Sequence, residues 1–288
     1  MTVTNRKLFI ILDGNLYIHR TYHALKPLHV QVGHYQVSAV YGFFKLIFKL
    51  LNMFKPDYFL ICFDYPAKYF RHDIFQDYKS NRKPLENSLI DQMKIIRDGI
   101  TALNIMQLEI KGYEADDLIA TIVNQNSLYN IKIIVISGDK DILQLINDDR
   151  VKVWDDAKHI MYSTQEVKRK YGVTPRQLVD VLSLAGDIVD NIPGIYGIGL
   201  KTAIKLIQQF GTLENLFDNV NFVKGNLNKL LILGKYQAIL SKRLIRLNTN
   251  VPLHFSLASC EKQNIDMKKA YPFFNKYKLN SFIIKYCL

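Results

Sequence analysis

The sequence has few cysteines and no long hydrophobic run. Its three cysteines, Cys62, Cys260 and Cys287, are odd in number, widely spaced and never paired as CxxC, so it predicts neither a disulfide framework nor a zinc site. No apolar run is long enough to span a bilayer, and the N-terminal strand-like run meets Asp13 instead of a signal-peptide cleavage site. We therefore expect a cytoplasmic protein in which Cys62 packs inside a strand.

Negative charge is scarce overall but concentrated in a few places. The chain has 38 Lys and Arg against 26 Asp and Glu, a net charge of +12, and nine of the acids are clustered. Without those nine, 17 acids remain and the rest of the chain carries +21 (38 − 17). Such an excess attracts polyanions such as nucleic acids, although charge alone fits equally well with a protein kept soluble by its basic pI or with a lysine-rich proteome.

The clustered acids suggest a site for divalent cations. They are Asp13, Asp64, Glu114, Asp116, Asp117, Asp139, Asp141, Asp187 and Asp190. Carboxylates that are brought together repel one another and lose hydration, so a fold that gathers several of them normally needs cations. Taken singly, Glu114 to Asp117 can cap the helix predicted at 118–123, and Asp139 and Asp141 can serve as turn and N-cap residues. Their joint occurrence at strand ends and helix starts favours the metal site.

The first part of the chain predicts an α/β fold with a mostly parallel central sheet. Residues 8–12, 58–63 and 131–136 are short apolar runs typical of buried strands, and each leads to an acid. Segments with helical spacing, at 37–54 and 89–103, lie between them. Open α/β sheets bind ligands at the carboxyl ends of their strands, so we expect Asp13, Asp64 and Asp139 to converge there.

From residue 171 onward the chain is predicted to be helical. Helices are expected at 175–184, 201–210 and 235–247, with 218–228 as a connecting loop or, equally, a pair of short helices. We therefore divide the chain into an α/β domain, residues 1–170, and a helical domain, residues 171–288. No repeat of fixed period and no low-complexity tract is evident.

The helical part opens with a glycine-rich segment, 186–205, that predicts a helix-hairpin-helix motif. Asp187 and Asp190 are three residues apart and would share one face of a helical turn. Three glycines in six residues, Gly194, Gly197 and Gly199, then allow a tight turn and a close approach to another molecule. Backbone amides and Lys201 can hold a phosphate there. An ordinary Pro-Gly turn between two helices is the simpler alternative.

Cations alternate with aromatic residues between 68 and 84. On a helix, Phe75, Tyr78, Lys79 and Arg82 would lie along one face. This chemistry suits a nucleic-acid strand that is held by its phosphates while its bases stack. The alternative is a surface helix whose aromatic side chains pack on the core.

Taken in order, these motifs resemble a known family. They are Leu12 to Asn15, Arg20 to Ala24, Phe63-Asp64, Phe70 to His72, Tyr78 to Arg82, Gly112 to Asp117, Gly138 to Asp141, and Gly186 to Gly199. From about residue 7 to about 282, the chain resembles the 5′ nuclease domain of bacterial DNA polymerase I, the bacterial branch of the flap endonuclease family. Here that domain would stand alone, and the resemblance implies that residues 1–170 form its catalytic nuclease domain and residues 171–288 its DNA-binding domain.

The resemblance implies hydrolysis of phosphodiesters at 5′ ends and 5′ flaps of nicked or gapped duplex DNA, including RNA-primed strands, in replication and repair. It implies two ions of Mg²⁺ or Mn²⁺, held by the nine acids, with water as the nucleophile. Hard cations suit carboxylate ligands. The chain would act as a monomer, with a separate DNA polymerase as a possible partner.

The resemblance also assigns DNA contacts. Arg20, Arg71, Lys79 and Arg82 would contact the scissile phosphate or the threaded 5′ strand, and residues 68–97 would form a helical arch around it. Tyr22 would stack on a terminal base, and Tyr78 is a further DNA-binding candidate. The duplex backbone would be held at the hairpin, where the family commonly places K⁺, by Gly194, Gly197, Gly199, Lys201 and Thr202.

The hairpin departs from the family pattern, and two alternative functions stay open. The departures are at Ile188, Val189, Tyr196 and Leu200, which puts the hairpin's contacts with K⁺ and duplex in question. A non-catalytic binder of branched or nicked DNA would keep the scaffold without turnover, but it gains nothing from nine carboxylates that face phosphate. A related RNA-cleaving nuclease would need the acids but neither the hairpin nor the arch.

Overall fold

A six-stranded sheet forms the centre of the structure, a computed structural model that describes residues 6–26, 30–125, 128 and 130–287. The strand order is β5-β4-β1-β6-β7-β8, parallel throughout except for the last pair. The three predicted strands are confirmed as β1 (Leu8–Asp13), β4 (Tyr58–Cys62) and β6 (Lys132–Ile136). The sequence did not reveal β5 (Met106–Leu108), β7 (Val151–Asp155), β8 (Ile160–Tyr162) or the small ribbon of β2 (Gln31–Val32) and β3 (Tyr35–Gln36).

The sheet is buried on both faces because side chains alternate along each strand. From β1, Ile10 and Leu12 enter one hydrophobic cluster, whereas Phe9 and Ile11 enter the other. The first cluster is covered by α1 (Gly14–Leu25), α2 (Ser38–Phe54) and α4 (Asn87–Ala102), so both helices predicted in this half are confirmed. Cys62 is buried in β4, as expected, and both Cys62 and Cys260 are free thiols.

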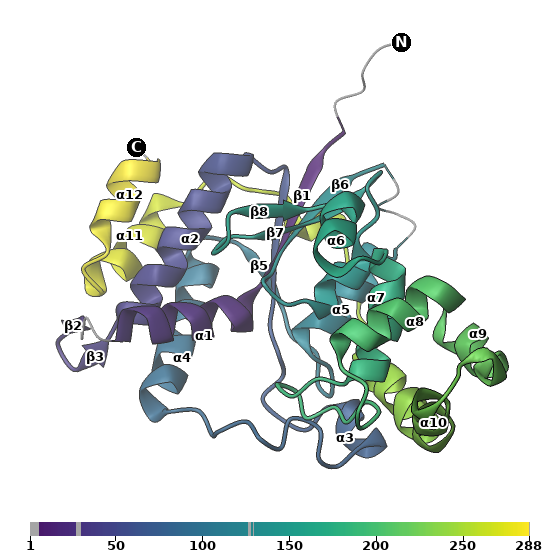
Figure 1. Cartoon of the computed structure of the whole chain (residues 1–288). Coiled ribbons are helices and arrows are strands. Elements are labelled where there is room, and N and C mark those ends of the chain that lie inside the picture. Colours follow the sequence, from purple (N-terminus) through teal and green to yellow (C-terminus); the bar gives the residue numbers. More distant parts are fainter. Residues whose placement is uncertain (1–5, 27–29, 126–127, 129, 288) are drawn as a thin grey trace, which may run out of the picture.

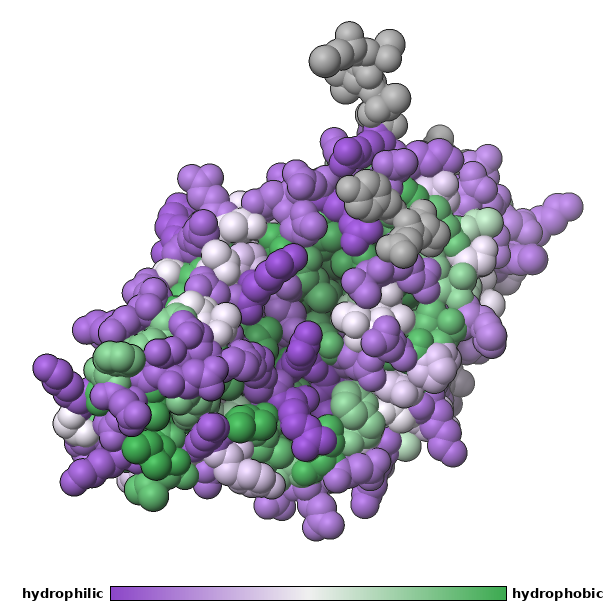
Figure 2. Space-filling view, turned by 90° about the vertical axis from the view of Figure 1, so that its right-hand side faces the viewer, coloured by the Kyte–Doolittle hydropathy of each residue, from purple (hydrophilic) through white to green (hydrophobic). Residues whose placement is uncertain are grey.

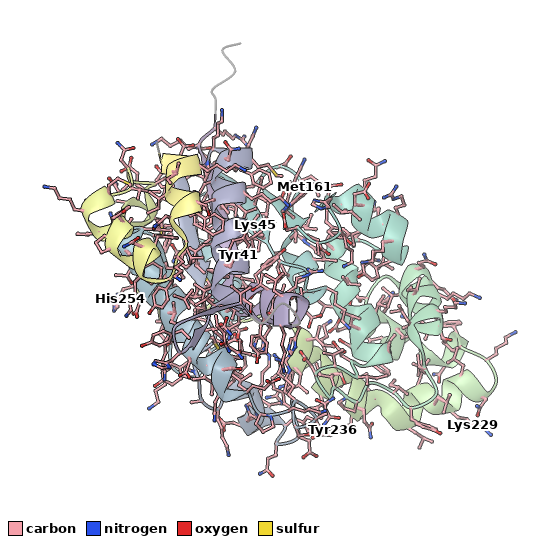
Figure 3. The ribbon with its side chains drawn as sticks, turned by 90° about the vertical axis from the view of Figure 1, so that its left-hand side faces the viewer. Tyr41, Lys45, Met161, Lys229, Tyr236 and His254 are labelled. Carbon is pink, nitrogen blue, oxygen red and sulfur yellow. The ribbon has the colours of Figure 1, made fainter. Side chains whose placement is uncertain are left out.

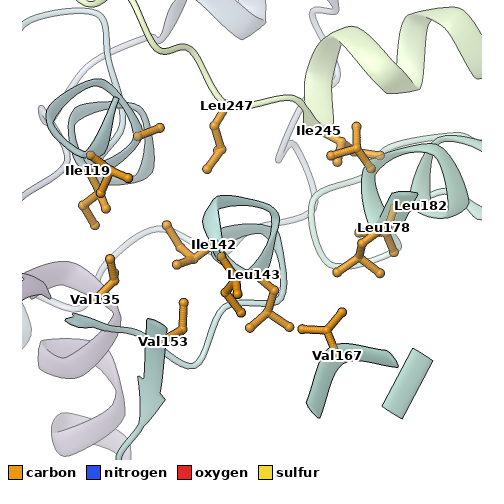
Figure 4. Close-up of a cluster of buried hydrophobic side chains, with 14 of the residues drawn as sticks. Ile119, Val135, Ile142, Leu143, Val153, Val167, Leu178, Leu182, Ile245 and Leu247 are labelled. Carbon is orange, nitrogen blue, oxygen red and sulfur yellow. The ribbon is translucent and has the colours of Figure 1, made fainter. Parts of the chain in front are cut away.

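The second cluster joins the sheet to the later helices (Figure 4). It is covered by α5 (Ala115–Val123) and α7 (Pro175–Ala185), with the 3₁₀ helix η3 (Asp141–Leu145) between them. The start of α7 is fixed by a capping box of Thr174 and Gln177, with Pro175 in the first turn.

Beyond the sheet, α6 (Thr164–Tyr171), α8 (Leu200–Phe210), α9 (Leu213–Asp218) and α10 (Asn226–Ile245) form the right-hand part of Figure 1. The helices predicted at 175–184 and 201–210 are confirmed, whereas the one predicted at 235–247 is the second half of the longer α10. Segment 218–228 connects α9 to α10, as predicted, and contains one short 3₁₀ helix, η4 (Val220–Phe222), before α10 begins at Asn226.

After η5 (Leu257–Cys260), the chain returns to the first half of the molecule. Helix α11 (Met267–Lys276) packs on α4, and α12 (Asn280–Cys287) packs on α2 (Figure 1). Phe274 thereby lies against Phe44 and Phe48. The domain boundary near residue 170 stays a prediction. Among the described residues, no helix has the length and apolarity needed to cross a membrane.

Candidate active site

Three acids meet at one edge of the sheet, as the strand pattern predicted. Strands β4, β1 and β6 are neighbours, with Leu12 in register with both Ile61 and Ile136, so Asp13, Asp64 and Asp139 follow the same ends of parallel strands. The Ser137 hydroxyl donates to Asp13 Oδ2 at 3.0 Å. Sequence reasoning missed Ser137, although its place between β6 and Asp139 could have indicated this role.

The acidic start of α5 joins these strand ends. Glu114 is the N-cap of the helix and Asp116 lies in its first turn, which confirms the predicted helix start. The Ala115 amide donates to Asp64 Oδ1 at 2.8 Å and so ties the start of α5 to the end of β4. The strand-end acids and Asp116 therefore form one group, here called the acid cluster: Asp13, Asp64, Asp116 and Asp139.

Electrostatics confirm that the acid cluster is crowded. Burial and then the charge of Asp64 raise the pKa of Asp13 to about 7. Burial, followed by the charges of Asp13 and Asp139, raises the pKa of Asp116 well above its usual range. The pKa values of Asp64 and Asp139 are raised as well, mainly by burial. Such a group is stable in its charged form only with added positive charge.

A second group of acids adjoins the first. One carboxylate oxygen each from Asp141, Asp187 and Asp190 lies within 4.8 Å of the other two. The helical turn expected for Asp187 and Asp190 is instead a tight turn, closed by hydrogen bonds between the backbones of Asp187 and Ile192 at 2.8 and 2.9 Å. The turn still places both carboxylates toward Asp141.

The donor set of this second group fits a hard divalent cation. Asp141 Oδ1 is buried and has no hydrogen-bond partner among the described residues, and an unpartnered buried carboxylate oxygen is costly unless a cation binds it. Among the described residues, the candidate ligands grouped here are all carboxylates, which suits Mg²⁺, Ca²⁺ or Mn²⁺ better than zinc. Lys140 Nζ lies 2.8 Å from Asp187 Oδ2 at the border of the group.

Two predicted cations lie directly beside the acids. Lys79 Nζ binds Glu114 Oε1 and lies 3.6 Å from Asp190 Oδ2, while Arg82 Nη2 lies 2.6 Å from Asp190 Oδ1. Burial would lower the pKa of Lys79, but the charge of Glu114 holds it well above its usual range, so the ammonium stays charged.

The segment predicted to form a helical arch, residues 68–97, is only partly helical. Within residues 68–97, only α3 (Phe70–Ile74) and the first part of α4 are helical, and residues 76–82 form turns. Asn81 Nδ2 donates to the Ile188 carbonyl and Asn191 Nδ2 to the Asp77 carbonyl, both at 2.7 Å. Sequence reasoning missed these two asparagines. They link residues 76–82, here called the basic turn, to the tight turn of residues 187–192.

Arg71 and Asp117 do not serve as predicted. Arg71 is only 1% exposed and binds both oxygens of Asp117, at 2.6 and 2.8 Å, and Glu114 Oε2 at 2.7 Å. Its Nε also donates to the Leu244 carbonyl at 2.7 Å, and Asp117 accepts the Asn248 amide at 2.8 Å. These donors occupy both oxygens of Asp117, so Asp117 is a structural residue and the prediction that it binds metal is wrong. Arg71 is the buried ion-pair partner of Asp117, and the prediction that it contacts a phosphate is also wrong.

Both predicted tyrosine contacts with DNA also need correction. Tyr22 is 1% exposed, and its hydroxyl bonds to Glu86 and Ser88, so a base has no access to its ring. Tyr78 is likewise buried, with its hydroxyl 3.1 Å from Glu114 Oε2. Arg20 is partly exposed beside Asp155, at 3.5 Å, which leaves it accessible to a ligand.

The glycine-rich segment joins α7 to α8. Gly194 is buried, and a Cβ there would collide with the backbone of Gly186, so this glycine permits close backbone packing. Gly197, Gly199 and Lys201 are exposed and Thr202 is half-buried. The four residues that depart from the family pattern, Ile188, Val189, Tyr196 and Leu200, are all exposed.

The raised pKa values predict how the metal-free protein responds to pH. Acids whose folded pKa exceeds the unfolded value favour folding when they are protonated, and that stability is lost as pH rises through the folded pKa. With chelator present, the free energy of unfolding should therefore fall as pH rises from the ordinary Asp pKa of 3.8 to about 7, the folded pKa of Asp13. Burial lowers the pKa of His19, which acts in the opposite direction, but as a single group.

Urea denaturation at pH 5, 6, 7 and 8 with EDTA measures this trend. Excess Mg²⁺ should flatten the curve, because a bound cation favours the ionised acids. A metal-free protein that becomes more stable from pH 5 to pH 7 would contradict the crowding of the acid cluster.

Comparison with known families agrees with this geometry. Residues 8–172 match the family model for the 5′-3′ exonuclease N-terminal resolvase-like domain, and residues 173–268 match that for the 5′-3′ exonuclease C-terminal SAM fold. Together the two matches cover most of the chain.

Individual relatives agree with the family-model matches. A 5′-3′ exonuclease of Aquifex aeolicus is 34% identical over 263 residues, 91% of this chain and 89% of that protein. DNA polymerase I of Bacillus subtilis is 36% identical over 286 residues, 98% of this chain but only 32% of the polymerase. The chain thus spans about a third of the length of its DNA polymerase I relatives.

Among solved structures, the bacteriophage T5 flap endonuclease, in a complex with DNA and metal ions, superimposes with a TM-score of 0.70 at 20% identity. The match covers 94% of this chain and 100% of that one. At this identity the likeness shows a shared fold.

Proposed function

The chain belongs to the 5′-3′ exonuclease family, and we propose that it is a structure-specific 5′ nuclease that hydrolyses phosphodiesters at 5′ ends and 5′ flaps of duplex DNA. The observation that carries the proposal is the meeting of the acid cluster with Asp141, Asp187 and Asp190, beside the cations Lys79 and Arg82. Removal of RNA primers in replication and repair is part of the proposal.

Divalent cations, Mg²⁺ or Mn²⁺, would be held by the acid cluster and by Asp141, Asp187 and Asp190. When bound, such cations supply Lewis acidity and a more acidic water at neutral pH. The protein's own contribution is to hold eight carboxylates, including Glu114, on rigid strand ends, a helix start and a closed turn. Lys79 and Arg82 add positive charge beside the place where a phosphate would meet these acids.

Beyond the acids, the exposed Gly197, Gly199 and Lys201 would hold the duplex backbone, with K⁺ as a further proposed ligand of the hairpin. Arg20 and Arg82 would contact the 5′ strand near residues 68–97. A cytoplasmic location, a monomeric state and a separate DNA polymerase as partner belong to the same proposal and rest on the family resemblance.

Replacement of Lys79 tests the proposed role of the basic turn. Lys79→Ala should lower the single-turnover cleavage rate about 100-fold or more, because a charged group that stabilises the transition state is worth roughly that factor. Folding should persist, since Glu114 keeps Arg71 and Tyr78 as partners. Lys262→Ala, an exposed cation outside residues 68–97 and the hairpin, is the matched control and should cleave at nearly the normal rate. Equal rates in the two variants would remove Lys79 from the site.

The proposed activity itself is tested with a 5′-labelled flap duplex and purified protein in Mg²⁺, in Mn²⁺ and in EDTA. Cleavage near the flap junction that requires the metal supports the nuclease. Tight binding to the junction without product in either metal would favour the non-catalytic binder. Cleavage of structured RNA but not of DNA flaps would favour the RNA-cleaving alternative.

A further inference from the structure

The outer face of α10 exposes an apolar stripe that the proposed nuclease activity does not use. Ile232, Leu233, Tyr236 and Ile239 are 53%, 79%, 73% and 45% exposed. Figure 3 labels Tyr236, together with Lys229, on this light-green helix. Figure 2, which faces the α8 to α10 side of the molecule, shows hydrophobic side chains at the surface among hydrophilic ones.

The stripe has the spacing of a helix-pairing seam. Lys229, Ile232, Tyr236, Ile239 and Arg243 follow one another at intervals of three, four, three and four residues, which is the a/d pattern of two heptads. Over these 14 steps the seam extends for about 21 Å along the helix. Its centre is apolar, and each of its ends carries a cation.

The seam lies opposite the face that α10 uses inside the molecule. The buried positions of α10 are Leu231, Gly234, Ala238, Ser241, Leu244 and Ile245. Gly234 meets Ile195, and Ser241 accepts the Gly194 amide at 3.0 Å, so the hairpin packs on the buried side. A duplex held at the hairpin therefore does not cover the seam.

The cations at the two ends of the seam restrict which helix can bind to it. Neither Lys229 nor Arg243 forms an ion pair within the part of the chain that the structure describes. In a pair of α10 helices from two copies, Lys229 would face either Lys229 or Arg243 of the other copy, so like charges would meet in both orientations. A second copy is thus disfavoured, and acids are required at both ends of the occupant.

We infer that this face of α10 docks an amphipathic helix of a partner protein, whose apolar seam of about two heptads is flanked at both ends by Asp or Glu. Burial of the exposed apolar side chains would drive the association, and the end charges would set its register. The inference does not depend on the nuclease activity, because none of these residues belongs to the acid cluster or the basic turn.

A pair of synthetic peptides tests the inference on the full chain. One is a 21-residue helix with leucine at the central seam positions and glutamate at the two end positions, and the other has lysine at those ends. In methyl-labelled protein, the glutamate peptide should shift the NMR signals of Ile232, Leu233 and Ile239. Its affinity should exceed that of the lysine peptide by at least tenfold. Equal affinities, or no shifts at these methyl groups, would overturn the inference.

Variants localise the effect. The double variant Leu233→Ser and Tyr236→Ser should abolish peptide binding and leave flap cleavage unchanged. Met53→Ser, at an exposed apolar residue of α2, is the matched control and should bind normally. If the double variant instead weakens flap-duplex affinity, the face belongs to DNA. If it dissociates a dimer in sedimentation, the occupant is a second copy. Either result would overturn the inference.

Discussion

Replacement of Asp116 by asparagine should lower the flap cleavage rate about a thousandfold while the protein stays folded. Asp116 belongs to the acid cluster, where burial and then the charges of Asp13 and Asp139 raise its pKa well above the usual range. A thousandfold loss corresponds to about 4 kcal/mol of transition-state stabilisation, which is reasonable for one charged ligand of a catalytic cation. Single-turnover kinetics on a labelled flap duplex at saturating Mg²⁺ measures the effect.

Asp116→Asn should not lower the thermal midpoint or the affinity for duplex DNA when metal is absent. Without metal, its thermal midpoint should rise above that of the wild type, because one of several mutually repelling buried carboxylates is gone. Its affinity for the duplex in EDTA should be equal or higher, since less negative charge faces the phosphates. Asp98→Asn, at an exposed acid of α4, is the control and should change none of the three. Loss of activity accompanied by a lower midpoint would instead indicate misfolding.

The sequence predicted the sheet edge well because the relevant signals are local. An apolar run followed by an acid identifies a strand and its end, and parallel pairing brings the ends of β4, β1 and β6 together without further information. The same logic located Glu114 and Asp116 at the start of α5. The short strands β5 and β8, at three residues each, are too brief to produce a pattern.

The individual site residues were harder to predict because burial depends on contacts between distant segments. Arg71 and Lys79 both belong to the same cationic and aromatic motif, and nothing local distinguishes them. The structure does so by placing residues 244–248 over Arg71. Lys79 instead contacts Glu114 and Asp190, in a turn that Asn81 and Asn191 join to residues 187–192. Tyr22 was assigned to DNA by the family resemblance, although its side chain is buried and its hydroxyl bonds to Glu86 and Ser88. Residue type thus predicted the chemistry, and tertiary packing decided which residues perform it.

Replacement of Arg71 by alanine should destabilise the protein by about 3–5 kcal/mol, because it leaves the fully buried Asp117 without its partner cation. Burial alone would lower the pKa of Arg71, but the hydrogen bonds and charge of Asp117 raise it, so the pair is charged in the wild type. The thermal midpoint should fall by on the order of 10 °C. Differential scanning calorimetry in EDTA measures this without any contribution from bound metal.

Arg82→Ala provides the matched comparison, since Arg82 contacts Asp190 at 2.6 Å but has half of its side chain exposed. An exposed ion pair contributes about 1 kcal/mol or less, so the midpoint of this variant should change little while flap cleavage falls. In the double variant Arg71→Met and Asp117→Asn, which removes both charges, much of the lost stability should return, because the carboxylate is no longer buried unpaired. If Arg71→Ala kept its midpoint and lost only cleavage, Arg71 would belong with Lys79 and Arg82 after all. The buried guanidinium would then have to leave Asp117 to reach a phosphate, and its four hydrogen bonds to Glu114, Asp117 and Leu244 oppose that movement.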